Sequence, residues 1–343
     1  MADIEELYRQ TFGCAPTAFE PIAACGSDRR YFRLKGVDGS VIGCINADVK
    51  ENGAFVSFAR SFRAAGLPVP EIYGVSADGS AYLQQDLGGE TLYDRVAKDW
   101  LPLADEPAAV FPEALESLYR KVLEQLVKLQ LTGRKVIDYS KCTPCPAFHR
   151  DAIHWDLNYF KYFFLKLTRT AFDEQALEDD FRTLADYLLS VPHDAFLYRD
   201  FQSANVMLAG DEPWFIDFQG GRRGALPYDP ASMLFDAKTR LPKAVRDRLT
   251  DFYYDSLTRQ LPLLAPDLPL PSRSDFMAAF RGYTLVRLMQ ALGAFGLRGL
   301  VEHKPGFAES IPPALALVRE CFETDALPVA LPELRRLACH RGL

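Results

Sequence analysis

The sequence predicts an α+β fold with two lobes, a small β-rich lobe followed by a large helical lobe. Three observations support this prediction. The chain has 343 residues, which is more than one ordinary hydrophobic core organises. Short strand-like segments separated by turn signals fill residues 20–86, whereas long amphipathic periods dominate beyond Gly88. We therefore expect an N-terminal lobe at residues 1–86, a C-terminal lobe at residues 87–343 and a cleft between them.

The N-terminal lobe is expected to contain an antiparallel meander. Its first strands are the segments EPIAAC, RYFRLK and SVIGCIN, which the turn signals GSD and KGVDG separate. The segment NGAFVSFARSFRAAG has apolar residues on one helical face and predicts a helix that ends at Gly66. The alternating segment SAYLQQDL predicts a further strand at the junction between the lobes.

The C-terminal lobe is expected to be helical apart from one hairpin. Its amphipathic periods predict helices at about 112–132, 155–170, 173–190, 241–263, 273–297 and 310–324. Two short apolar runs, YRDFQSANVML and PWFIDFQGG, flank the turn AGDEP and therefore predict a β-hairpin among these helices.

The composition of the chain limits the classes of partner. It carries 39 Lys and Arg residues against 46 Asp and Glu residues, and no dense basic run relieves the net charge of −7. This balance disfavours nucleic acid and anionic membranes as partners. The N-terminal segment MADIEELYRQ lacks the pattern of a secretory signal, and no segment is apolar over the length that spans a bilayer. We expect a cytoplasmic protein that acts on a small molecule.

Seven cysteines are scattered along the chain, and this odd number favours a reducing compartment over a disulfide framework. Only Cys142 and Cys145 are close in sequence. The segment CTPCPAFHRDAIH offers them, together with His149 and His154, as a candidate zinc site. The alternative is a loop that its two prolines explain without a metal.

The predicted hairpin brings three oxygen-bearing side chains together. Strand pairing places Asn205, at the start of the hairpin, next to Asp217, at its end, and the preceding loop returns Asp200 to the same point. Carboxylate and amide oxygens suit Mg²⁺, which takes its remaining ligands from water or phosphate. The alternative is that each residue only caps a turn, which is a common role of Asp and Asn.

The segments YRDFQSAN and IDFQGG resemble the catalytic loop and the metal-binding aspartate segment of the aminoglycoside phosphotransferase and choline kinase superfamily, which is related to the protein kinases. Within this superfamily the chain is most similar to the bacterial kinases that phosphorylate the anomeric hydroxyl of N-acetylmuramate and N-acetylglucosamine in cell-wall recycling. The similarity extends over residues 27–233 and includes the segments SDRRYFRL, FARSFRAAGLPVPEIY and LQQDLG.

This resemblance implies a protein-kinase-like two-lobed fold and transfer of the γ-phosphoryl group of ATP to an acceptor hydroxyl. It implies that Asp217 and Asn205 hold Mg²⁺ ions at the phosphates and that Asp200 accepts the proton of the attacking hydroxyl. It also implies that backbone groups at the lobe junction bind adenine, for which we select Gln85 and Leu87.

The chain departs from the family pattern in three parts of the site, the third of which is the phosphate-covering loop. Tyr198 stands where the catalytic loop usually has His, a position that supports the loop. The strand SVIGCIN lacks the Lys that pairs with the phosphates, and the helix NGAFVSFARSF offers no Glu to orient such a Lys.

The phosphate-covering loop GSDRRYF, with its single Gly, is expected to supply other donors. The candidates in and beside this loop are Ser27, Arg29, Arg30 and Arg33, because the planar guanidinium of Arg donates two hydrogen bonds to phosphate. The alternative for the arginines is a solvated edge strand.

The acceptor is expected to bind near HRDAIHWDLNYFKYFF and near the segment that follows Asp217. Asp156 is a candidate for hydrogen bonds to sugar hydroxyls, although Asp is also a common helix cap. Arg222 and Arg223 are candidates to hold an acceptor carboxylate or to shield phosphate charge. The alternative is a turn with two solvated arginines.

Two other functions stay open at this point. In the first, the chain phosphorylates another small alcohol, such as an aminoglycoside, choline or a homoserine-like metabolite. In the second, it is a pseudokinase that binds a nucleotide without catalysis. Arg222 and Arg223 disfavour a polycationic acceptor. The retention of Asp200, Asn205 and Asp217 disfavours the pseudokinase.

Overall fold

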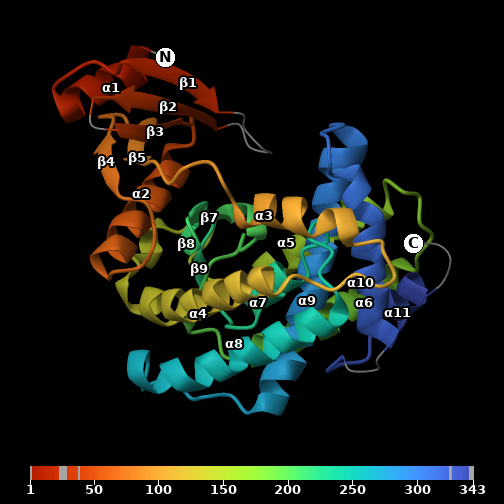
Figure 1. Cartoon of the computed structure of the whole chain (residues 1–343). Helices are drawn as coiled ribbons and strands as arrows, with labels where there is room; N and C mark the ends of the chain where they lie inside the picture. The colour runs from red at the N-terminus through yellow and green to blue at the C-terminus, as the bar shows by residue number, and fades with distance from the viewer. Residues whose placement is uncertain (1, 23–28, 38, 324–326, 340–343) are drawn as a thin grey trace.

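The computed structural model describes residues 2–22, 29–37, 39–323 and 327–339. In this part of the chain the N-terminal lobe is an antiparallel sheet in the order β1-β2-β3-β5-β4, accompanied by two helices (Figure 1). The elements are α1 (Ala2–Phe12), β1 (Ala18–Ile22), β2 (Arg30–Gly36), β3 (Gly39–Ile45), α2 (Val49–Ala64), β4 (Ile72–Val75) and β5 (Ala81–Gln85). The expected meander and its helix are confirmed, whereas α1 was not predicted.

The sheet buries both faces because neighbouring residues of a strand point to opposite sides. Leu83 of β5 belongs to a core cluster with Ile4 and Leu7 of α1. The adjacent Tyr82 stacks on Phe55 of α2, with 5.2 Å between the ring centroids. The sheet is therefore held between α1 and α2.

Helix α2 also packs into the helical lobe. Its Phe62 contacts Phe196 and Phe218 edge to face, with centroid distances of 5.1 Å and 5.4 Å. Helix α4 (Glu113–Val136) approaches this cluster closely at Gly133, where a Cβ atom would lie 2.9 Å from the Phe196 side chain. One hydrophobic core thus runs from α2 into the helical lobe.

The remaining helices form the large lobe (Figure 1). They are α3 (Leu92–Asp99), α5 (Arg150–Phe160), α6 (Glu174–Ser190), α7 (Tyr228–Leu234), α8 (Lys243–Leu264), α9 (Arg273–Phe295), α10 (Ile311–Glu323) and α11 (Pro332–Cys339). Helix α4 packs along α8, and α5 packs along α9. The expected helices are confirmed, with π-helical turns at Lys161–Leu165 and Gly296–Val301 continuing α5 and α9. None of the helices in the described ranges is long and apolar enough to cross a membrane.

The predicted hairpin is confirmed. Strands β7 (Val206–Ala209) and β8 (Glu212–Phe215) pair antiparallel, with Val206 opposite Phe215. A second antiparallel pair, β6 (Ala195–Leu197) with β9 (Arg222–Gly224), lies beside it in sequence and frames the loops that carry Asp200 and Asp217.

The candidate zinc site is not formed by the described residues, among which there is no group of three or more His, Cys, Asp or Glu side chains placed to hold a metal. The Sγ atom of Cys145 lies 3.2 Å from the carbonyl oxygen of Ala147 and 3.2 Å from Nη1 of Arg222. Burial raises the pKa of Cys142 to about 11, so this thiol stays neutral near pH 7. The loop is therefore a protein-packed turn.

Candidate active site

The hairpin brings Asp200, Asn205 and Asp217 to one place. The Nδ2 atom of Asn205 donates to the backbone oxygen of Asp200 at 2.8 Å and lies 3.4 Å from Oδ2 of Asp217. All three residues line both of two neighbouring cavities, of about 800 Å³ and 730 Å³. Their placement agrees with the prediction.

The first cavity, which we call the junction cavity, lies between the sheet and the hairpin. Its apolar lining comes from both lobes and comprises Ile22, Ile42, Phe55, Leu87, Met207 and Ile216. Gln85 also lines it, but the backbone N–H of Gln85 donates to the Glu71 carbonyl at 2.8 Å. An apolar lining from both lobes suits a flat heterocycle.

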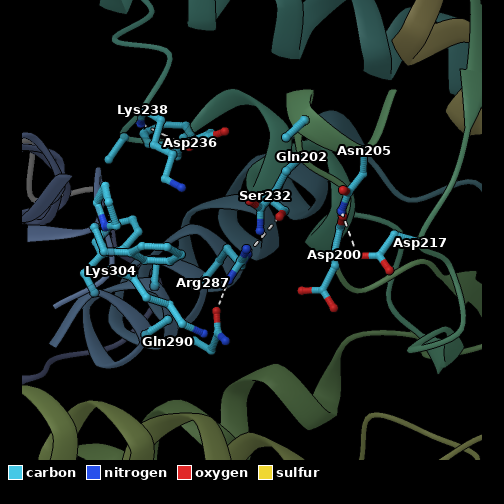
Figure 2. A pocket seen from close by; sticks show the side chains of 18 residues that line it. Asp200, Gln202, Asn205, Asp217, Ser232, Asp236, Lys238, Arg287, Gln290 and Lys304 are labelled. Carbon is cyan, nitrogen blue, oxygen red and sulfur yellow. Dashed lines mark hydrogen bonds between the residues drawn. The ribbon is translucent and has the colours of Figure 1, made fainter. Parts of the chain in front are cut away.

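The second cavity, which we call the helical cavity, extends from Asp200 toward α9. Polar and charged residues line much of it, namely Gln202, Ser232, Asp236, Lys238, Arg287, Gln290 and Lys304. Figure 2 shows Asp200, Asn205 and Asp217 on one side, Lys238 and Lys304 on the other, and Arg287 between them. The two cavities therefore meet at the three residues of the hairpin.

Besides Asn205, two further side chains donate hydrogen bonds to the Asp217 carboxylate. Arg29 Nη1 lies 2.9 Å and Gln219 Nε2 lies 2.6 Å from Oδ1. Asp217 adopts a φ of 67°, a left-handed conformation that a non-glycine residue keeps only when its surroundings hold it. Burial among protein atoms raises the pKa of Asp217, and the two donors oppose this shift, while 37% of the side chain stays accessible from the cavities.

Arg29 is buried and forms ion pairs on both sides of the cleft. Besides Asp217, it pairs through Nη2 with Oε1 of Glu51, which lies 2.7 Å away in the first turn of α2. The expectation that this helix offers no Glu was wrong. Glu51 comes directly before the segment from which that expectation was drawn, because the Asp48 cap starts the helix earlier than the apolar pattern does.

The other candidate phosphate-binding residues are placed differently. Arg33 lines the junction cavity, but its guanidinium is held by Asp86 at 2.6 Å and by the Gly88 carbonyl at 2.9 Å. Arg30 is exposed on β2. Ser27 lies outside the described residues. Arg29 is therefore the candidate that the structure brings to Asp217.

The loop that carries Asp200 is fixed from behind by Asp229. Its carboxylate accepts from the backbone N–H groups of Tyr198 and Arg199, at 2.9 Å and 3.0 Å, and from Nε2 of Gln130 at 2.9 Å. Burial raises the pKa of Asp229 to about 7. The Tyr198 hydroxyl donates to the carbonyl of Ile216, so Tyr198 ties the loop to the residue before Asp217.

The predicted acceptor-binding residues do not line either cavity, because other groups in the protein hold them. Asp156 forms a buried ion pair with Arg199, with Oδ1 2.5 Å from Nη2. Arg222 donates to the Gly220 carbonyl at 3.0 Å and to Cys145 Sγ. Arg223 pairs with Asp194 at 2.6 Å and lies over the Tyr139 ring.

Sequence reasoning missed the polar residues of the helical cavity. Arg287 lies in the apolar segment GYTLVRLMQALG of α9, and a single cation in such a segment was the available signal. Ser232, in the segment PASML of α7, hydrogen-bonds Arg287.

The fold and the site together define a phosphotransferase. The model of the family described as "Phosphotransferase enzyme family" matches residues 18–264, and the chain belongs to this family.

Comparisons with individual proteins agree with this assignment. The N-acetylmuramate/N-acetylglucosamine kinase of Pseudomonas aeruginosa is 24% identical over 331 residues, covering 93% of this chain and 90% of that protein. The kinase of the same name from Neisseria meningitidis serogroup B is 25% identical over 305 residues, with coverage of 87% and 84%. Among solved structures, choline kinase from Cryptosporidium parvum has a TM-score of 0.60 at 12% identity and covers 91% of each chain. This last likeness confirms the protein-kinase-like fold.

Proposed function

We propose that this phosphotransferase moves the γ-phosphoryl group of ATP to the anomeric hydroxyl of an amino sugar. The observation that carries the proposal is the convergence of Asp200, Asn205 and Asp217 where the two cavities meet. The names of the two bacterial relatives support an amino sugar as the acceptor. A role in cell-wall recycling stays a prediction.

ATP fits the junction cavity by its chemistry. The apolar residues from both lobes would enclose adenine, and Leu87 would offer it backbone groups at the lobe junction. Arg29 does not line this cavity, but it donates a hydrogen bond to Asp217, which lines the cavity where the phosphates would meet the hairpin. Its fixed guanidinium would supply the charge that the strand SVIGCIN lacks.

The donor set at the hairpin fits Mg²⁺. Asp217 offers a carboxylate, and the side-chain hydrogen bonds of Asn205 to described residues leave from Nδ2, so that its Oδ1 is available to a cation. When bound, Mg²⁺ would neutralise charge on the ATP phosphates. The hydrogen bond from Arg29 orients the Asp217 carboxylate before any ligand arrives.

Asp200 is suited to the role of general base. Its carboxylate makes no ion pair or side-chain hydrogen bond with any residue in the described ranges, and it lines both cavities. A carboxylate in this position is free to accept the proton of an acceptor hydroxyl and to orient that hydroxyl toward the phosphates.

An ADP-release screen tests the proposal. N-acetylmuramate, N-acetylglucosamine, other hexoses, choline and aminoglycosides are supplied as acceptors, and phosphorus NMR of the product locates the new phosphate. We expect turnover with the amino sugars and a phosphate on the anomeric oxygen. Turnover with choline or an aminoglycoside alone would replace the acceptor while leaving ATP-dependent transfer intact. Nucleotide binding without turnover of any acceptor would favour a pseudokinase.

A further inference from the structure

Arg287 is a buried cation that forms no ion pair with any carboxylate in the described part of the chain. Only 7% of its surface is exposed, and this exposed part faces the helical cavity. Its Nε donates to Ser232 Oγ at 2.8 Å, and its Nη1 donates to Gln290 Oε1, so both of these partners are neutral (Figure 2). No carboxylate of the described residues lies within ion-pairing distance of its guanidinium. Its Nη2 also forms no hydrogen bond within that set.

Three other buried arginines have the usual arrangement, in which a carboxylate neutralises the guanidinium charge. Arg29 and Arg199 pair with carboxylates, as does Arg246, which contacts Glu320. Arg222 pairs with no carboxylate among the described residues, but it lines neither cavity and is held by two backbone carbonyls and a thiol. Burial of a charge without an ion-pair partner costs free energy, and such a charge facing a cavity is typical of a ligand-binding group.

A second cation faces the same part of the cavity. The Nζ atom of Lys238 lies 4.4 Å from the centre of the Phe307 ring, and no ion pair joins it to a described carboxylate. Lys304, which also lines the cavity, pairs with Glu302 at 3.2 Å.

Asp236 is the acidic group at this end of the cavity. Its carboxylate accepts from the backbone N–H of Lys238 at 3.1 Å and from Ser203 Oγ at 3.3 Å. Burial raises the pKa of Asp236 and the charges of Lys238 and Arg287 oppose this rise, so Asp236 attracts both cations without forming an ion pair with either. Charge therefore divides along the cavity, with Asp200 and Asp217 at the hairpin and a surplus of cations toward α9.

We propose that the acceptor carries a carboxylate, which Arg287 binds with help from Lys238, while the acceptor hydroxyl faces Asp200. This inference rests on the proposed function and deepens it, because it assigns an acidic amino sugar as the preferred substrate. Carboxylate and guanidinium form charge-assisted hydrogen bonds. The negative charge at Asp200 and Asp217 disfavours the reversed orientation of such an acceptor.

The test compares N-acetylmuramate, which has a carboxylate, with its methyl ester and with N-acetylglucosamine, which lack one. We expect Arg287→Gln to lower kcat/KM for N-acetylmuramate by about 10–100-fold, mainly through KM, since a hydrogen bond to a charged group is lost. We expect less than about threefold change with either neutral sugar. The partly exposed Lys238→Met is a second variant with a smaller loss of the same selectivity, about 3–10-fold.

Arg222→Gln is the matched control, because it also removes a buried arginine with neutral partners, outside both cavities. Any effect of this control should be equal for the acidic and neutral sugars. Equal losses for both classes of sugar in Arg287→Gln and Lys238→Met would overturn the carboxylate site while leaving the proposed function standing. Absence of turnover with every amino sugar by the unaltered protein would instead overturn the proposed function, and the acidic acceptor with it.

Discussion

Arg29 donates from Nη1 to Oδ1 of Asp217 over 2.9 Å and so joins the sheet lobe to the hairpin of the helical lobe. The same guanidinium pairs with Glu51 on α2. One buried cation therefore links α2 to the carboxylate that we propose as a metal ligand.

Replacing Arg29 should impair use of the nucleotide. We expect Arg29→Gln to lower kcat/KM for ATP by about 10²–10³, the usual effect of losing one fixed donor at a site of developing charge. Arg30→Gln is the matched control, because Arg30 is the next residue but is exposed. Initial rates over a range of ATP concentrations measure both, with thermal melting to verify folding. A kcat/KM for ATP within threefold of that of the unaltered protein would show that Arg29 does not act on the phosphates.

Replacing Asp200 should remove the base and leave nucleotide binding intact. We expect Asp200→Asn to lower kcat by about 10²–10⁴, the scale of general-base catalysis. Titration with an unhydrolysable ATP analogue should give the affinity of the unaltered protein. Asp211→Asn, in the exposed turn of the same hairpin, serves as the control. A kcat near that of the control would show that Asp200 is not the base.

Breaking the Asp156–Arg199 ion pair should destabilise the fold. Both side chains are mostly buried, with 7% and 15% of each exposed, so Asp156→Ala leaves a guanidinium without its counter-charge. We expect a loss of about 3–5 kcal/mol in the free energy of unfolding. Asp247→Ala, which breaks the exposed pair with Lys243, should cost less than about 1 kcal/mol. Denaturant unfolding measures the loss of free energy in both variants. Equal losses would show that the buried pair is worth no more to the fold than the exposed pair.

The stability of the fold should depend on pH through Asp229. Burial raises its pKa from 3.8 to about 7, so between these values the folded protein keeps a proton that the unfolded chain has released. The free energy of unfolding therefore falls as pH rises through this window, by on the order of 4 kcal/mol from this group alone. At low pH, where both states are protonated, this penalty is absent.

The measurement is the difference in unfolding free energy between the unaltered protein and Asp229→Asn, taken from pH 4 to pH 8. As pH rises, the free energy of unfolding of the unaltered protein should fall relative to that of the variant, because Asn cannot titrate. The Asn variant should also lose activity, since its NH2 group would face one of the two backbone N–H groups, of Tyr198 or Arg199, that the carboxylate now accepts from. A difference that is constant over the window would show that Asp229 titrates alike in both states.

The sequence predicted the part of the site that local geometry determines. Asp200, Asn205 and Asp217 are joined by one tight hairpin, whose pairing follows from two apolar runs and a turn. Arg222 and Arg223 follow the same hairpin closely, but pairing of β9 with β6 turns them to other partners. The prediction that Arg222 and Arg223 reach the acceptor was drawn from their closeness to Asp217 in sequence, whereas the pairing of β9 decides where their side chains point.

The rest of the site depends on contacts between distant segments. Arg287 reaches the helical cavity only because α9 packs against α7, and the hydrogen bond to Ser232 records that contact. Glu51 meets Arg29 only because α2 stands between the sheet and the helical lobe. Neither relationship is encoded in a local pattern, because packing between helices decides which side chains face the same space.

The phenylalanines of α2 constrain how the enzyme can open. Rotation of the whole N-terminal lobe away from the helical lobe would expose Phe58 and Phe62 to solvent. Both side chains are completely buried, so this exposure would cost about 1.5–3 kcal/mol for each ring. We therefore expect α2 to stay packed on the helical lobe when the site opens. Nucleotide exchange would then proceed by movement of the outer strands of the sheet relative to α2, about the Arg29–Glu51 contact.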